Sequence, residues 1–335
     1  MQNLLPMVAL LASLSGAALA QTSPDSTAPP VPGRLVDLGG YRLHLWCTGK
    51  GGPTVVIVPG ASEHSFNWVL VQPAVARLTR VCSCDRGGEA WSDLGPRPRT
   101  KTQEAFNLRR ALIASGEPGP YVLVGHSMGG DVVRLFQADH PNEVAGMVLV
   151  DGGSAEGVTN LDGREGPTRS FSRGRPIPAP RESLAAGDSL TALGVSRIRE
   201  ATKNVHPAIE PPFDKLPAEQ QRWRLWALNQ PKHYISMDSG FIGEEAERVY
   251  TENHKSPSSL AGVPLVVLCR DTTVDKSHDP LHVVHAQEMA KQSKLGEFRI
   301  VSGAGHHIHL DKPEAVIEGI ERVVAEVRKG AASKK

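Results

Sequence analysis

Apolar residues recur in short runs along the chain, and each run ends at a turn signal. A β-hairpin is predicted for Arg34–Leu38 and Tyr41–Cys47, because both runs carry strand-forming residues and they flank Gly39-Gly40. The next run, Thr54–Val58, is almost wholly apolar, which is typical of a strand in a sheet covered on both faces. From residue 34 onward the chain therefore predicts a buried sheet.

Strands and helices then alternate. Further strands are predicted at Arg80–Cys84, Tyr121–Val124, Val144–Val150, Pro264–Cys269 and Glu297–Val301. Helices are predicted at Phe66–Leu78, Glu104–Ser115, the stretch after Ser127, His282–Gln292, and a final stretch opened by a capping box of Asp311 and Glu314. This alternation predicts an α/β fold with a mostly parallel central sheet and helices on both faces.

The alternation fails between Gly152 and about Ser259. Ser154–Pro180 is rich in Gly, Arg and Pro, and the helical pieces that follow are short and polar. We interpret this stretch as a cap inserted into one core, with boundaries at 33–153 for the first part of the core, 154–259 for the cap and 260–335 for the second part. The aromatic residues of the cap either line an apolar pocket or pack the cap onto the core: Trp223, Trp226, Tyr234 and Phe241.

The chain begins with a mostly apolar segment, Leu4–Leu19, that ends in Ala18-Leu19-Ala20 before polar residues. This pattern predicts a cleaved signal peptide at residues 1–20 and a flexible leader at residues 21–32. A secreted or periplasmic protein with no stable membrane insertion after cleavage is therefore expected, and a retained membrane anchor is the alternative. The net charge of +1 gives no reason to expect nucleic acid as a partner.

An exported chain can form disulfides, so the position of each cysteine matters. Cys47 ends one predicted strand, while Cys82 and Cys84 lie two residues apart on the next and face the same side. We hypothesise a disulfide from Cys47 to Cys82 or to Cys84, with buried free thiols as the alternative. Cys269, on a later strand, is expected to be unpaired.

The motif Gly125-His126-Ser127-Met128-Gly129 lies at the junction of a predicted strand and a predicted helix. A serine there is held on a strained turn, and the glycines are needed because a Cβ would collide with the neighbouring strand and helix. The turn presents Ser127 Oγ as a nucleophile, and the backbone N–H of Met128 points toward an oxyanion. The second oxyanion donor usually comes from the loop after the first parallel strand, which makes Ala61 the candidate.

With these residues in view, the chain resembles the α/β-hydrolase superfamily over nearly all of its length after the leader. The matching segments are Val58-Pro59-Gly60, Cys84-Asp85-Arg86-Gly87 through Trp91-Ser92-Asp93, Gly125 to Gly130, and Gly305-His306 through Pro313-Glu314. The resemblance implies that His306 is the general base. Dehalogenases and epoxide hydrolases of this superfamily attack with a carboxylate, so Ser127 argues against both. Asp85 and Arg86 are interpreted as structural residues that pair within their loop.

The acid of the triad is where the chain departs from the superfamily pattern. In most relatives it stands nine residues beyond the position of Pro264, and Thr273 occupies that position here. Asp151, at the end of the strand after the nucleophile helix, matches the other place where relatives carry the acid. Asp151 is therefore the first choice, Asp275 is held in reserve and Asp271 ranks third.

We therefore expect a serine hydrolase that cleaves a small-molecule carboxylic ester through an acyl-enzyme, with no metal or organic cofactor. His307 and His309 suggest a metal site, but no Cys or carboxylate set with ligand spacing accompanies them. Two alternatives stay open. One is an amide-cleaving enzyme that resembles proline iminopeptidases, in which Glu244, Glu245 and Glu247 would hold an amino terminus. The other is a binding protein with a hydrolase-like fold and little turnover.

Overall fold

The computed structural model describes residues 28–96, 99–152, 208–238, 260–275 and 282–333. All regular elements given below belong to the compact unit Val31–Lys335. The predicted signal peptide, most of the leader, Phe241 and Glu244–Glu247 lie outside the described residues, as do most residues of the predicted cap. Within the described part of the chain, no helix is both long enough and apolar enough to cross a membrane.

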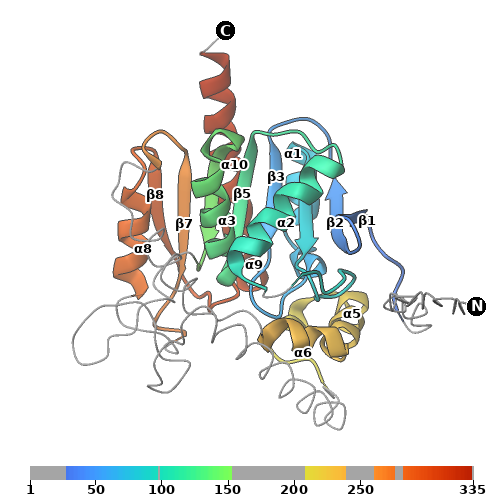
Figure 1. Cartoon of the computed structure of the whole chain (residues 1–335). Helices are drawn as coiled ribbons and strands as arrows, with labels where there is room; N and C mark the ends of the chain where they lie inside the picture. Colours follow the sequence, from blue (N-terminus) through green and yellow to red (C-terminus); the bar gives the residue numbers. More distant parts are fainter. Residues whose placement is uncertain (1–27, 97–98, 153–207, 239–259, 276–281, 334–335) are drawn as a thin grey trace, which may run out of the picture. The chain divides into compact units, whose positions relative to one another are not determined.

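The described strands form one eight-stranded sheet in the order β1-β2-β4-β3-β5-β6-β7-β8 (Figure 1). Their bounds are β1 Arg34–Asp37, β2 Arg42–Thr48, β3 Thr54–Val58, β4 Val81–Asp85, β5 Tyr121–His126, β6 Val144–Val150, β7 Leu265–Arg270 and β8 Gly296–Val301. The β1–β2 and β2–β4 pairings are antiparallel, and every other pairing is parallel. The predicted hairpin and the predicted mostly parallel sheet are both confirmed.

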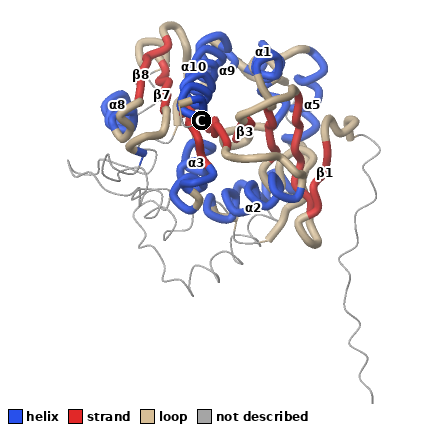
Figure 2. Tube along the Cα trace, turned by 90° about the horizontal axis from the view of Figure 1, so that it is seen from above, coloured by secondary structure: helices blue, strands red, loops and turns tan. Residues whose placement is uncertain are grey.

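Helices cover both faces of the sheet (Figure 2). One face carries α2 (Lys101–Ala114), α3 (Met128–Asp139) and α8 (His282–Lys291), and the other carries α1 (Gln72–Leu78) and α10 (Pro313–Ala332). Successive side chains of a strand point to opposite faces, so Val56 of β3 joins the first core and Ile57 joins the second. This is why the central strands are buried at nearly every position and mostly apolar.

The predicted helix Phe66–Leu78 is in fact two elements, the 3₁₀ helix η1 (Ser65–Trp68) and α1. Pro73 lies in the first turn of α1. Proline is tolerated only at the start of a helix, because it lacks an N–H and its ring clashes with the preceding turn. A single helix through Pro73 was therefore a wrong prediction.

The predicted capping box of Asp311 and Glu314 is also wrong. Lys312 is the N-cap of α10, and no side chain caps that helix end. Asp311 instead ends the short helix α9 (Ile308–Asp311) and accepts a hydrogen bond from the backbone N–H of Gly305 at 2.8 Å. Pro313 explains the shift, because the residue before a proline is driven out of the helical region and α10 can begin only at the proline.

A disulfide joins Cys47 to Cys82, one of the two pairings that the sequence left open. The two residues lie directly opposite each other in the antiparallel register of β2 and β4. Cys84 and Cys269 are free and buried.

The described part of the predicted cap contains α5 (Ala218–Leu228) and α6 (Pro231–Asp238), drawn in yellow in Figure 1. Trp223 packs edge-on against Trp91 and Phe66 of the core, with ring centroids 5.2 and 5.8 Å apart. Trp226 contacts Trp91 as well, at 5.4 Å. These two tryptophans therefore pack α5 onto the core, which agrees with the second of the two roles considered for them.

Candidate active site

Ser127 lies between β5 and α3 with φ 50° and ψ −125°, a conformation that non-glycine residues rarely adopt. A Cβ on Gly125 would lie 2.5 Å from the carbonyl O of Gly129. A Cβ on Gly129 would lie 2.2 Å from the carbonyl O of Val58. The two glycines thus allow β3, β5 and α3 to meet at a sharp turn, as the motif predicts. Ser127 keeps 8% of its surface exposed there.

Asp151 directly follows β6 and also has a positive φ, 47°. Its backbone N–H donates to the carbonyl O of Leu268 on β7 at 2.7 Å. A Cβ on Gly152 would lie 2.3 Å from the carbonyl O of Ser127, so the backbone after β6 runs against the serine turn. The end of β6 is therefore packed beside the candidate nucleophile.

His306 lies on the loop between β8 and α9, and its Nδ1 is 2.6 Å from Asp151 Oδ2. A carboxylate accepts from Nδ1–H, which leaves Nε2 as the nitrogen that can take up a proton. Burial, the largest influence, lowers the pKa of His306 below its ordinary value, against the opposing hydrogen bond to Asp151. The imidazole is therefore neutral at pH 7, as a general base requires.

Two further side chains hold Asp151. Arg270, at the end of β7, places Nη2 2.5 Å from Asp151 Oδ2, and its backbone N–H donates to Oδ1 at 2.9 Å. His282 Nε2 lies 2.8 Å from Asp151 Oδ1. Burial alone would raise the pKa of Asp151, but the hydrogen bonds from His282 and His306 and the charge of Arg270 outweigh it and hold that pKa well below its usual range.

The other two aspartates considered for the triad acid have different contacts. Asp275 Oδ2 accepts from Arg270 Nη1 at 3.1 Å and from the backbone N–H of His306 at 3.3 Å. Asp271 accepts from the N–H and hydroxyl of Thr273 and from the N–H of Gly303, as in a local turn. Asp151 thus supplies the short contact to the imidazole ring, while Asp275 supports the backbone behind it.

The loop that carries Ala61 lies against Ser127, because a Cβ on Gly60 would be 3.1 Å from Ser127 Cβ. Both sides of the Gly60 peptide group are fixed. Its N–H donates to Glu63 Oε2 at 2.8 Å, and its carbonyl accepts from Arg86 Nη2 at 2.7 Å. Ala61 itself is exposed.

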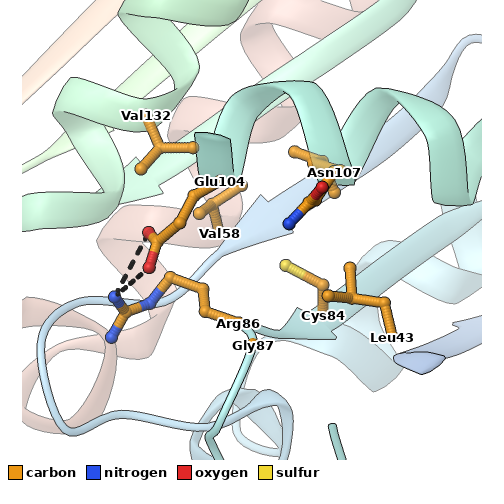
Figure 3. A pocket seen from close by; sticks show the side chains of 9 residues that line it. Leu43, Val58, Cys84, Arg86, Gly87, Glu104, Asn107 and Val132 are labelled. Carbon is orange, nitrogen blue, oxygen red and sulfur yellow. Dashed lines mark hydrogen bonds and ion pairs between the residues drawn. The ribbon is translucent and has the colours of Figure 1, made fainter. Parts of the chain in front are cut away.

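Arg86 pairs with Glu104 of α2, Nη1 to Oε1 at 3.2 Å (Figure 3). Asp85 accepts from the N–H of Ser65 and contacts His44 Nδ1, both at 2.7 Å, so its short contacts lie outside its own loop. Within the loop, Arg86 lies 3.9 Å from Glu89, and the N–H of Trp91 lies 3.5 Å from Asp85, so the expected pairing inside the loop is present but long. Figure 3 shows that the Arg86–Glu104 pair borders a small cavity with Val58, Cys84 and Asn107 among its lining residues. Ser127 and His306 are not among the residues that line this cavity.

A carboxylate that the sequence did not associate with His307 and His309 lies next to them. Glu63 is fully buried, and its Oε2 is 2.8 Å from Nδ1 of His126, the residue before the serine. Burial would raise the pKa of Glu63, but the charge of His126 and the nearby His309 and His307 lower it strongly. Burial holds the pKa of His309 well below its ordinary value and lowers that of His307 to about 4, so both rings are neutral.

The family model described as "Alpha/beta hydrolase family" matches residues 55–318. The chain belongs to this family, which supports a hydrolase.

Two solved structures illustrate the shared fold. The epoxide hydrolase CorEH is 17% identical, with a TM-score of 0.63 over 88% of this chain and 98% of that one. A thermophilic esterase from Thermogutta terrifontis is 22% identical, with a TM-score of 0.58 and the same coverage. Among curated sequences, a probable transporter, efuK, from Hormonema carpetanum is 26% identical over 303 residues. That match covers 87% of this chain but only 42% of the transporter's own length.

Proposed function

We propose that the chain is a serine hydrolase that cleaves carboxylic esters through an acyl-enzyme, with Ser127 as nucleophile, His306 as general base and Asp151 as the acid. The observation that carries the proposal is the 2.6 Å contact between His306 Nδ1 and the buried Asp151 carboxylate, beside a serine on a strained turn. This contact selects the imidazole tautomer that a serine hydrolase needs.

In the proposed mechanism, the first half of the reaction forms the acyl-enzyme. Ser127 Oγ attacks the ester carbonyl carbon while His306 Nε2 takes the hydroxyl proton. The oxyanion that forms accepts hydrogen bonds from the N–H groups of Ala61 and Met128. His306 then returns its proton to the leaving alkoxide, and the alcohol departs from an acyl-Ser127 intermediate. In the second half, His306 takes a proton from a water molecule as that water attacks the acyl carbon. The imidazole then returns the proton to Ser127 Oγ as the bond from the acyl carbon to Oγ breaks, which releases the carboxylic acid and restores the free serine.

The contacts around Asp151 fit this cycle. His306 becomes positively charged in each half-reaction, and a carboxylate that stays ionised stabilises that charge. Arg270 and His282 keep Asp151 ionised and oriented, because together they occupy lone pairs that His306 does not use. The hydrogen bonds of the Gly60 peptide group to Glu63 and Arg86 hold the oxyanion loop in a similar way. They fix the backbone that carries the N–H of Ala61.

The proposal is tested by the initial rate of p-nitrophenyl ester hydrolysis, from acetate through octanoate, by the protein that lacks residues 1–20. Ser127→Ala is the matched control, because it removes one oxygen atom and leaves the fold. We expect turnover that this substitution abolishes. Hydrolysis that survives in Ser127→Ala, or the absence of hydrolysis of both ester and amide substrates, would contradict the proposal, and the second result would favour the binding-protein alternative.

We also propose that the protein is exported and that the insertion at 154–259 covers the active site. The apolar segment at residues 1–20 and the Cys47–Cys82 disulfide support export, because disulfides persist in oxidising compartments. Cell fractionation with N-terminal sequencing tests this, and Gln21 is the expected first residue. Mature protein that keeps Met1 in the cytoplasmic fraction would contradict export.

A further inference from the structure

Four side chains that take no direct part in the proposed reaction meet beside the serine turn, and we call them the Glu63 cluster: Glu63, His126, His307 and His309. Glu63 Oε2 also accepts the N–H of Gly60 that fixes the oxyanion loop, while Oε1 has no such role. Gly60 lies against both the Glu63 cluster and the serine turn, because a Cβ on Gly60 would be 2.8 Å from His126 Nδ1 and 3.1 Å from Ser127 Cβ. Glu63, His126 and His309 are at most 1% exposed, while the side chain of His307 keeps 24% of its surface exposed.

The donor atoms of the cluster lie close to the two carboxylate oxygens of Glu63. Glu63 Oε2 is 2.8 Å from His126 Nδ1. Glu63 Oε1 is 3.4 Å from His307 Nε2 and 3.5 Å from His309 Nε2. The ligand atoms of Glu63, His126 and His309 all lie within 4.8 Å of one another.

Several of these atoms are buried without a hydrogen-bond partner among the described residues. Glu63 Oε1 accepts no hydrogen bond there, and neither ring nitrogen of His309 makes one. A buried polar atom without a partner costs about 1–3 kcal/mol, and more if it is charged. The ring of His309 is nevertheless held in place, stacked on Trp68 with centroids 4.5 Å apart.

We propose that the Glu63 cluster binds a zinc ion through Glu63, His126, His307 and His309. Three imidazoles and a carboxylate are typical zinc ligands. In a tetrahedral site with bonds of about 2.0–2.1 Å, neighbouring ligand atoms are about 3.3 Å apart, close to the 3.4 and 3.5 Å from Glu63 Oε1 to His307 Nε2 and His309 Nε2. The ion satisfies Glu63 Oε1 and His309 Nε2 at once, and it enters past His307.

The site also explains the second nitrogen of His126. Its Nε2 lies 2.9 Å from the carbonyl O of His306, which can only accept. A zinc-bound imidazole commonly donates its other N–H to a backbone carbonyl, which fixes the ring. The zinc ion therefore anchors the backbone of His306, the proposed base, and this part of the inference rests on the proposed function.

A second buried group, with His64, Glu89 and His233, has ligand spacing as well. Glu89 is already satisfied there, because Oε2 pairs with His233 Nδ1 at 2.8 Å and Oε1 accepts from the Ser236 hydroxyl at 2.9 Å. Glu63 Oε1, in contrast, has no hydrogen-bond partner among the described residues, which makes the Glu63 cluster the better zinc site. Glu89→Gln is a matched control for Glu63→Gln, since both replace a buried carboxylate between histidines.

Metal content tests the site independently of ester hydrolysis. The purified protein, stripped with a chelator and reloaded with Zn²⁺, should retain one zinc per chain by elemental analysis and native mass spectrometry. Co²⁺ in its place should show the visible absorption of four-coordinate cobalt. Glu63→Gln should lower zinc affinity at least about 100-fold, while Glu89→Gln should leave it unchanged. His307→Gln, at the partly exposed position, should weaken binding if Glu63→Gln does not fold.

Each contrary result is distinct. Failure of the wild-type chain to bind Zn²⁺ and Co²⁺ would overturn the site, as would zinc that Glu63→Gln and His307→Gln both retain. Zinc lost only in Glu89→Gln would move the site to the other group. If zinc binds but its removal leaves kcat unchanged for an active esterase, the link to His306 is wrong. If the chain has no esterase activity, metal content still decides the zinc site.

Discussion

Replacing Asp151 with asparagine tests the choice of triad acid most directly. The new side chain can still accept a hydrogen bond, but its amide is as able to donate to His306 Nδ1 as to accept from it. Arg270 adds to the problem, because its Nη2 already lies 2.9 Å from His306 Nδ1. Without the carboxylate, Arg270 donates to an unprotonated Nδ1, the proton moves to Nε2, and the ring can no longer take the proton of Ser127.

The expected loss follows from this tautomer change. Removal of the acid of a serine triad lowers turnover on the order of 10⁴-fold, or about 5.5 kcal/mol of transition-state stabilisation. The variant should still fold. Arg270 loses its ion pair with residue 151, but Asp275 remains 3.1 Å from Arg270 Nη1 and still compensates the buried guanidinium charge. Breaking a buried ion pair outright costs about 3–5 kcal/mol, so the loss of stability should be smaller than that.

The assay is kcat for the best p-nitrophenyl ester, together with a thermal melt of each variant. Asp275→Asn is the control, since its carboxylate meets the backbone N–H of His306 and should change kcat by less than about tenfold. A folded Asp151→Asn with near-wild-type kcat would refute the assignment. Equal losses of kcat in both variants would refute the division of roles between the two aspartates.

Three further predictions follow from the contacts described. Arg86→Gln removes the guanidinium that donates to the Gly60 carbonyl. We expect kcat to fall about tenfold at constant KM, because one charged hydrogen bond is lost. A change in KM alone would contradict this. Trp223→Ala should lower the free energy of unfolding in urea by about 2–3 kcal/mol, because this side chain packs α5 against Trp91 of the core. The preference for acyl-chain length should stay unchanged. A changed preference at unchanged stability would instead show that Trp223 lines the substrate pocket. The hydrogen bonds from Arg80 lower the pKa of Glu117, so the stabilisation by this carboxylate is present above pH 4.5 and is lost as pH falls through the folded pKa. Glu117→Gln should therefore lower the free energy of unfolding by about 1 kcal/mol at pH 7 and make it less dependent on acid pH. Curves of unfolding free energy against pH that run parallel for the two proteins would contradict this.

Features set by neighbouring residues were predicted correctly from the sequence. The serine turn depends on Gly125 and Gly129, which must be small whatever the rest of the chain does. The strand segments are so apolar that each one predicts a buried strand without its neighbours, so the sheet could be predicted before its strand order was known. The errors at Phe66–Leu78 and at the start of the last helix both came from reading past a proline.

Contacts between distant segments could be predicted only where a motif or a cysteine marked both partners, as for Cys47–Cys82 and for Asp151 with His306. Glu63 meets His126 and His309 only because the loop after β3 and the loop after β8 converge on the serine turn. Arg270 and His282 reach Asp151 from β7 and α8, and neither belongs to a recognisable motif. A single sequence assigns these residues to no partner, because hydrogen bonds and charges across such separations depend on the complete fold.

The long connection between β6 and β7 has a consequence for protein engineering. β6 ends at Val150 and β7 begins at Leu265, yet the two strands are direct neighbours, with Met147 opposite Leu265 and Val150 opposite Leu268. Their register is set by the strands, and each doubling of the connection adds only about 0.6 kcal/mol of closure entropy. Chimeras that exchange this insertion between relatives should therefore keep a folded core, so that substrate preference can be transplanted separately from the reaction chemistry.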